Sequence, residues 1–232
     1  RFKAQTGGVY SLAWSADSRW IAAAGDGSET LHIWEASAGT LIKHLAGHPQ
    51  SILALAVSPD GRYLASAADD TTIRIWDVSS WKTVKILKGH TSRIRSVSWS
   101  PDGSKLVSGS NEGTIRTWDL ESGTQRQLLA EESKQARPGV NSVAWSADGN
   151  LIAAGCADNR VRIWSPASGQ LVNTLTGHGI AVMTLQWIAD SHQLISVDND
   201  AGIRSWDADA ATNVNTLVGH GIRAPAAAWS VS

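Results

Sequence analysis

Cysteine is almost absent from this sequence: Cys156 is the single one among 232 residues. One thiol excludes an internal disulfide, and it excludes a metal site built from several cysteines. Such a composition is typical of a protein kept in a reducing compartment, so we expect a cytoplasmic location.

Long apolar runs and an excess of one charge are also lacking. No stretch approaches the roughly 18 consecutive apolar residues of a transmembrane helix, and the start of the chain lacks the apolar segment of a signal peptide. We therefore expect no membrane contact. The formal net charge is −1, which gives no general attraction to nucleic acid and makes a nucleic-acid partner improbable.

Phenylalanine and tyrosine are scarce, with one and two copies, whereas tryptophan occurs twelve times. Five tryptophans recur at intervals of 42, 42, 46 and 42 residues, at Trp34, Trp76, Trp118, Trp164 and Trp206. A second series recurs at intervals of 43, 42, 46, 42 and 42 residues, at Trp14, Val57, Trp99, Trp145, Trp187 and Trp229. Two landmarks with one period indicate an internal repeat. We expect these tryptophans in the core, and we expect Trp20 and Trp81, which lie outside both series, at the surface.

The pattern of each period predicts four short strands separated by turns. In the third period the alternating residues 97–99 run into Ser100-Pro101-Asp102-Gly103, a sequence typical of a tight turn. One four-stranded sheet cannot bury both of its faces, but sheets stacked radially bury them against each other. The sequence therefore predicts an all-β fold, a β-propeller of four-stranded antiparallel blades. We place five full repeats at roughly 1–47, 48–89, 90–135, 136–177 and 178–219, with a partial repeat at 220–232.

Partial strands are expected at both ends of the chain. Residues 1–4 align with the end of a fourth strand, and residues 226–230 align with the first strand of a sixth repeat. We expect the chain to be a segment of a longer protein, with further domains as partners. The alternative is a five- or six-bladed ring, closed by these end strands or by a second copy.

Two recurring dipeptides identify a family resemblance. Gly-His occurs at Gly47-His48, Gly89-His90, Gly177-His178 and Gly219-His220, and Trp-Asp occurs at Trp76-Asp77, Trp118-Asp119 and Trp206-Asp207. With this period, the chain resembles the WD-repeat (WD40) propellers over essentially its whole length.

The resemblance implies a hydrogen-bonded tetrad of His, Ser or Thr, Asp and Trp inside a blade. It assigns two complete sets, His48, Ser66, Asp70 and Trp76, and His178, Ser196, Asp200 and Trp206. Glu112 replaces the aspartate in a partial set with His90, Ser108 and Trp118. The first repeat carries Gln5 and Ser28 in place of His and Asp, and the fourth carries Ala136 and Ala154 in place of His and Ser.

The resemblance also implies that partners dock on the top face, at the turns that enter each first strand. Carried over by position, this face comprises Tyr10, Ser51, Leu53, Asp69, Arg93, Arg95, Asn111, Asn141, Met183, Asn199, Arg223 and Pro225. Arg93, Arg95 and Arg223 are the leading candidates, because a guanidinium can clamp a carboxylate or a phosphate. The alternative is ordinary solvated charge.

The function expected from these features is a non-catalytic scaffold for protein or peptide ligands, or a ligand-sensing module of a larger signalling protein. No catalytic residue, metal ligand or cofactor is predicted, because the sequence has no Gly-x-Ser-x-Gly elbow, no phosphate-binding loop and no His-Glu-x-x-His motif. The alternatives are a hydrolase with its site in the central channel and a nucleic-acid-binding propeller.

Overall fold

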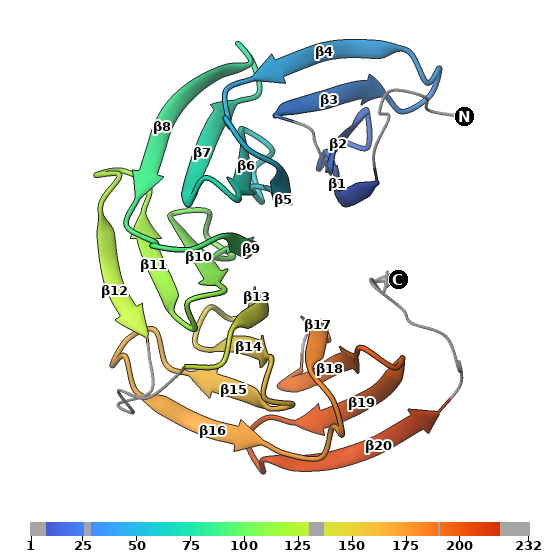
Figure 1. Ribbon diagram of the computed structural model, residues 1–232, viewed down its shortest axis with the longest axis vertical. Helices are drawn as coiled ribbons and strands as arrows, with labels where there is room; N and C mark the ends of the chain where they lie inside the picture. Colours follow the sequence, from blue (N-terminus) through green and yellow to red (C-terminus); the bar gives the residue numbers. More distant parts are fainter. Residues whose placement is uncertain (1–7, 26–28, 130–136, 190, 219–232) are drawn as a thin grey trace.

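The computed structural model describes residues 8–25, 29–129, 137–189 and 191–218 (Figure 1). The secondary structure in these ranges consists of twenty strands. No helix capable of crossing a membrane is present among the described residues.

The strands form five antiparallel sheets, each a meander of four consecutive strands. The first sheet contains β1 (Val9–Trp14), β2 (Trp20–Gly25), β3 (Thr30–Glu35) and β4 (Leu41–Ala46). The second contains β5 (Ile52–Val57), β6 (Tyr63–Ala68), β7 (Thr72–Asp77) and β8 (Lys82–Lys88). The third contains β9 (Ile94–Trp99), β10 (Lys105–Ser110), β11 (Ile115–Asp119) and β12 (Gln125–Leu129). The fourth contains β13 (Val140–Trp145), β14 (Ile152–Cys156), β15 (Val161–Trp164) and β16 (Leu171–Leu175). The fifth contains β17 (Val182–Trp187), β18 (Gln193–Asp198), β19 (Gly202–Asp207) and β20 (Thr212–Val218).

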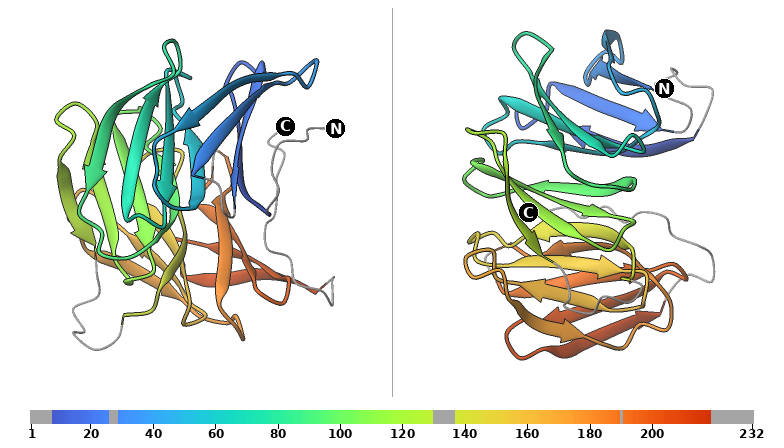
Figure 2. Two further views of the ribbon diagram at one scale, coloured as in Figure 1. Left: turned by 45° about the horizontal axis from the view of Figure 1, so that its top comes forward. Right: turned by 60° about the vertical axis from the view of Figure 1, so that its left-hand side comes forward.

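The sheets are arranged as blades around a common axis (Figures 1 and 2). In every blade the first strand lies nearest the centre and the fourth lies at the periphery, so β1, β5, β9, β13 and β17 face one another across the middle. The predicted all-β propeller of four-stranded antiparallel blades is confirmed. The end strands expected at 1–4 and 226–230 lie outside the described residues.

Neighbouring blades are joined by apolar side chains and by a repeated hydrogen bond. The serine at the third position of an inner strand accepts the backbone N–H of the next inner strand: Leu55 N lies 3.0 Å from Ser11 Oγ, and Val143 N lies 3.0 Å from Ser96 Oγ. Indole groups add a second link, since Trp99 Nε1 donates to the Ala56 carbonyl at 3.0 Å. The core therefore lies between the blades rather than inside any one of them.

The first blade departs from this arrangement. Ile94, Val97 and Trp99 of the third blade are each at most 8% exposed, whereas the residues in register on β1, Val9, Leu12 and Trp14, are 53%, 63% and 58% exposed. No described residue covers that face of the first sheet. The prediction that Trp14 is a core residue is therefore wrong for the described residues, and Trp229 lies outside them.

The surface position predicted for Trp20 is wrong, and Trp81, predicted at the surface as well, is half-buried. Trp20 is 7% exposed, and its ring meets that of Trp81 edge to face, with centroids 5.2 Å apart. Trp81 occupies the turn position that carries Gly123 in the third blade, and it shares the left-handed conformation, with φ of 54° against 70°. The Trp81 backbone is therefore strained, and the contact between blades holds the indole in place.

We predict that Trp81→Gly unfolds at a higher urea concentration than Trp81→Ala. Both variants lose the indole, but glycine also removes the backbone strain, which is about 1 kcal/mol for a non-glycine residue in this conformation. Gly123→Ala is the matched control. Its free energy of unfolding should fall by about 1 kcal/mol, because alanine is strained in the left-handed conformation. No clash adds to this cost, since the new Cβ would meet only Lys85 atoms at ordinary contact distance. A Trp81→Gly protein no more stable than Trp81→Ala would contradict the assignment of strain.

Candidate functional site

A chain of hydrogen bonds in the second blade joins the four residues predicted as a tetrad. Trp76 Nε1 lies 2.8 Å from Ser66 Oγ, Ser66 Oγ lies 2.8 Å from His48 Nε2, and His48 Nδ1 lies 2.8 Å from Asp70 Oδ2. An indole N–H can only donate, so the serine oxygen accepts it, and the same oxygen lies within hydrogen-bond distance of His48 Nε2. His48 Nδ1 donates to the Asp70 carboxylate, which can only accept. Ser66 is completely buried, so the group holds the blade together and is unsuited to nucleophilic attack.

The third blade closes the same network with a glutamate. His90 Nδ1 lies 2.6 Å from Glu112 Oε1, His90 Nε2 lies 2.7 Å from Ser108 Oγ, and Trp118 Nε1 lies 2.8 Å from Ser108 Oγ. The second carboxylate oxygen of Glu112 accepts the Thr91 backbone N–H at 2.8 Å. The prediction that this set is only partial is therefore wrong, because the longer side chain reaches both the histidine and the turn before β9.

Burial and hydrogen bonding set the charge states in this third network. Burial of the imidazole lowers the pKa of His90 to about 4, and the neighbouring Glu112 opposes that shift only in part. Burial also raises the pKa of Glu112, but hydrogen bonds from Thr114, Thr91 and His90 outweigh it and bring the pKa to about 2. At neutral pH the pair is a neutral imidazole that donates to a carboxylate.

The fifth blade uses a different aspartate from the predicted one. His178 Nδ1 lies 2.8 Å from Asp198 Oδ2, and Asp198 Oδ1 accepts the Gly202 N–H at 2.8 Å. A Cβ on Gly202 would lie 2.6 Å from Asp198 Oδ2. The Asp198 carboxylate therefore fills the space left by the missing side chain at residue 202, where the second blade has Thr72. The assignment of Asp200 is wrong: it is exposed, and the repeat register alone does not reveal that Asp198 takes its place.

The remaining contacts of the fifth blade resemble those of the second blade, with Ser196 Oγ 2.7 Å from both His178 Nε2 and Trp206 Nε1.

In the fourth blade, Ala154 offers no hydroxyl, and Trp164 Nε1 is buried without a hydrogen-bond partner among the described residues. Asp158, in register with Asp70, is bound by both terminal nitrogens of Arg162, at 2.9 and 2.7 Å. Gln5, Ser28 and Ala136 lie outside the described residues.

A bulge at the second residue of every inner strand shapes the centre of the molecule. The register skips one residue between Val9 and Ser11 on β1 and one between Val182 and Thr184 on β17, and the other inner strands repeat the irregularity. A bulge bends its strand and re-aims the unpaired side chain. The residues so displaced are Tyr10, Leu53, Arg95, Asn141 and Met183.

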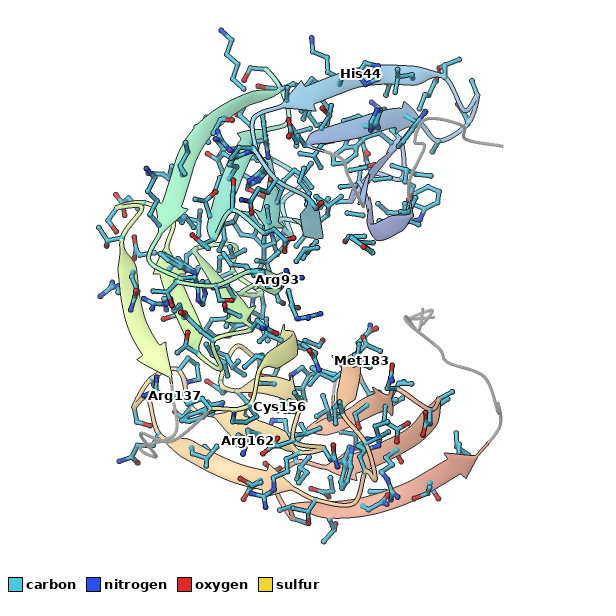
Figure 3. The ribbon with its side chains drawn as sticks, viewed as in Figure 1. His44, Arg93, Arg137, Cys156, Arg162 and Met183 are labelled. Carbon is cyan, nitrogen blue, oxygen red and sulfur yellow. The ribbon has the colours of Figure 1, made fainter. Side chains whose placement is uncertain are left out.

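These five bulge residues line one open cavity of about 530 Å³, called the central cavity below. Its wall also contains three other residues predicted for the top face, Ser51, Asp69 and Arg93. Figure 3 shows Arg93 and Met183 near the middle of the arc of blades. The wall draws on the inner strands of all five blades, so the site exists only in the assembled propeller.

Polar contacts fix several side chains of the cavity. Arg93 Nε lies 3.4 Å from Asp69 Oδ1, and Arg95 Nε donates to Asn111 Oδ1 at 3.2 Å. Asn141 Nδ2 donates to the Val182 carbonyl at 2.9 Å and so ties the fourth blade to the fifth. The Asp69 oxygen is buried, and among the described residues it accepts no hydrogen bond of good geometry.

Not every predicted top-face residue belongs to the cavity wall. Asn111 supports Arg95 from the rim, and Asn199 is half-buried with its N–H on the Ala181 carbonyl at 3.0 Å. Arg223 and Pro225 lie outside the described residues. The sequence interpretation missed the residues that directly follow the bulges, including Ser96, Ser142 and Thr184. The recurrence of a small polar residue there was the available signal.

Known proteins match the chain as follows. Residues 8–232 match the family model described as the IFT122 first beta-propeller. Nuclear distribution protein PAC1 of Coccidioides posadasii (strain C735) is 45% identical over 58 residues, which is 25% of this chain and 12% of that protein. Periodic tryptophan protein 2 homolog of Mus musculus is 37% identical over 62 residues, 27% of this chain and 7% of that protein. The chain thus matches only a small part of the length of these relatives.

We predict that Asp198→Asn destabilises the protein by about 1 to 3 kcal/mol, because Asp198 accepts from His178 with one oxygen and from Gly202 N–H with the other, and asparagine has only one oxygen to accept with. The matched control, Asp200→Asn, changes an exposed carboxylate two residues away and should alter the free energy of unfolding by less than about 0.5 kcal/mol. Urea denaturation measures both. A larger cost for Asp200→Asn would restore the original assignment.

Stability should also fall on acidification because of His90. The pKa of His90 in the folded protein is about 4, below the ordinary 6.5. Between these pH values His90 is protonated in the unfolded chain but neutral in the folded chain. This contribution is complete above pH 6.5 and is lost as the pH falls toward 4, by up to about 3 kcal/mol. Urea melts of wild type and His90→Gln across this range isolate it; parallel pH profiles would contradict the account.

Proposed function

The chain belongs to the WD-repeat propellers, in the family described as the IFT122 first beta-propeller, and on this premise we propose that it is a non-catalytic scaffold whose central cavity binds a protein or peptide partner. WD-repeat propellers generally serve as scaffolds for protein partners. The partner, the face it uses and the role within a longer regulatory protein belong to the proposal. The cytoplasmic location expected from the single cysteine stays a prediction.

One observation carries the proposal: the bulge residue of each inner strand lines the cavity and is of a different type in each blade. The first residue of the inner strands is always Val or Ile, and their third is always Ser, Ala or Thr. Those positions serve packing, as the hydroxyls of Ser11 and Ser96 bonded to the next blade illustrate. The second residue, the one displaced by the bulge, is a different type in each blade. Chemically different side chains that converge on one open cavity are what a binding surface requires.

The composition of the cavity also favours a protein partner. Tyr10, Leu53 and Met183 provide apolar and polarisable surface, and Arg95 and Asn141 provide hydrogen-bond donors, a mixture typical of interface centres. The Ser, His and acidic residues that resemble a catalytic set lie instead within the blades. Ser66 and Ser196 are completely buried, and each is occupied by an indole N–H.

Affinity capture tests the proposal. The 232-residue chain is used as bait in an extract of its source cells, beside a Tyr10→Ala, Leu53→Ala, Met183→Ala variant that leaves the arginines in place. We expect at least one protein to be captured by wild type and lost from the variant, because these side chains supply the apolar contacts.

A matched variant with Val84→Ala, Ile86→Ala and Leu171→Ala changes exposed apolar residues on the peripheral strands. It should capture the same proteins as wild type. If the cavity variant retains every captured protein, or if only the peripheral variant loses one, the docking site lies elsewhere and the proposal fails.

A further inference from the structure

Two arginines at the start of β9 line the central cavity. Arg95 is the bulge residue of β9, and Arg93 immediately precedes this strand; both line the wall. Arg95 Nε donates to Asn111 Oδ1 at 3.2 Å, and Arg93 Nε lies 3.4 Å from Asp69 Oδ1 in an ion pair without a hydrogen bond of good geometry. Figure 3 shows Arg93 extending toward the middle of the arc.

The outer ends of these guanidinium groups are uncommitted. Among the described residues, no acceptor forms a hydrogen bond with the terminal nitrogens of Arg93 or Arg95, in contrast to Arg162, whose two terminal nitrogens both bind Asp158. A guanidinium whose Nε faces a protein oxygen still offers a pair of parallel N–H donors at its outer end, which is the arrangement that fits two oxygens of a carboxylate or a phosphate.

The charge of the wall favours an anion. The lining residues contain one carboxylate, that of Asp69, and two guanidinium groups, those of Arg93 and Arg95. Asp69 partly compensates the positive charge of Arg93, since Asp69 Oδ1 lies 3.4 Å from Arg93 Nε. Asn111, the partner of Arg95, is neutral and leaves the charge of Arg95 uncompensated. The cavity therefore carries a net positive charge in a protein whose formal net charge is −1.

The surroundings of the arginines select the kind of molecule. The bulge residues of the second and fifth blades are Leu53 and Met183, which can pack against apolar side chains next to the anionic group. Nucleic acid would instead require a longer series of basic contacts along the backbone and aromatic platforms for its bases. We propose that Arg93 and Arg95 bind an acidic or phosphorylated side chain of a peptide segment with apolar residues on either side. This inference rests on the proposed function and names the chemistry of its partner.

Three peptides that differ at one position test the inference. Each has the sequence Gly-Leu-Xaa-Leu-Gly, with glutamate, phosphoserine or serine at the centre, and binding to the 232-residue chain is followed by NMR through the Arg side-chain N–H signals. We expect the glutamate or the phosphoserine peptide to bind at least about 10-fold more tightly than the serine peptide. The tighter of the two identifies carboxylate or phosphate as the source of the charge.

Variants then assign the preference to residues. Arg95→Ala and Arg93→Ala should each reduce the anionic peptide to the level of the serine peptide, and Arg95→Lys should retain only part of the preference because it loses the paired donors. The matched control is Arg126→Ala, which removes an arginine paired with Asp119 on a peripheral strand and should bind as wild type does. Asp69→Asn should bind the anionic peptide more tightly, whereas damage to the wall would weaken binding.

Several outcomes overturn the inference: no binding of either anionic peptide at millimolar concentration, equal binding of all three, or a preference that survives Arg95→Ala. Displacement of the peptides by a short DNA duplex, with steep salt dependence, would assign the arginines to nucleic acid instead. If capture depends on Tyr10, Leu53 and Met183 while Arg95→Ala binds as wild type does, the proposed function stands and only the anionic chemistry fails.

Discussion

Burial of both faces of each four-stranded sheet is the constraint on which the rest of this structure depends. A single blade cannot meet it, so the blades pack radially and their inner strands converge at the centre. The serine at the third position of an inner strand fixes the contact by accepting the N–H of the next strand, as Ser96 does for Val143. The bulge residue stands one position earlier, so the packing that joins two blades also directs one side chain of each blade into the central cavity.

Inside the blades the same acceptor is supplied from different positions. Asp70, Glu112 and Asp198 all bind the Nδ1 atom of the local histidine, although they stand at different sequence positions or have different lengths. The fourth blade uses an ion pair of Asp158 with the buried Arg162. What must be preserved is a partner for a buried polar group and not a particular residue. The scaffold can therefore change its internal contacts while the cavity stays in place.

The period of the tryptophans was enough to predict the blades, because a repeat of about 42 residues with a Trp at or next to the end of each third strand allows few other architectures. Residue-level details were less accessible. Asp198 was missed because its role depends on the absence of a side chain at Gly202, which is a three-dimensional relation between two residues. Trp20 and Trp81 were assigned to the surface because the contact between them joins two repeats. The cavity residues were found by position, but the bulge that unites them is a feature of strand pairing that composition does not reveal.

Site-specific photo-crosslinking tests the central claim most directly, that the bulge residues of the assembled blades form the binding surface. A photoreactive phenylalanine analogue is placed at Asn141, in the cavity wall, and in a separate protein at Val84, on a peripheral strand. The account predicts a crosslinked partner from position 141 and none from position 84. A partner crosslinked from position 84 alone would contradict it.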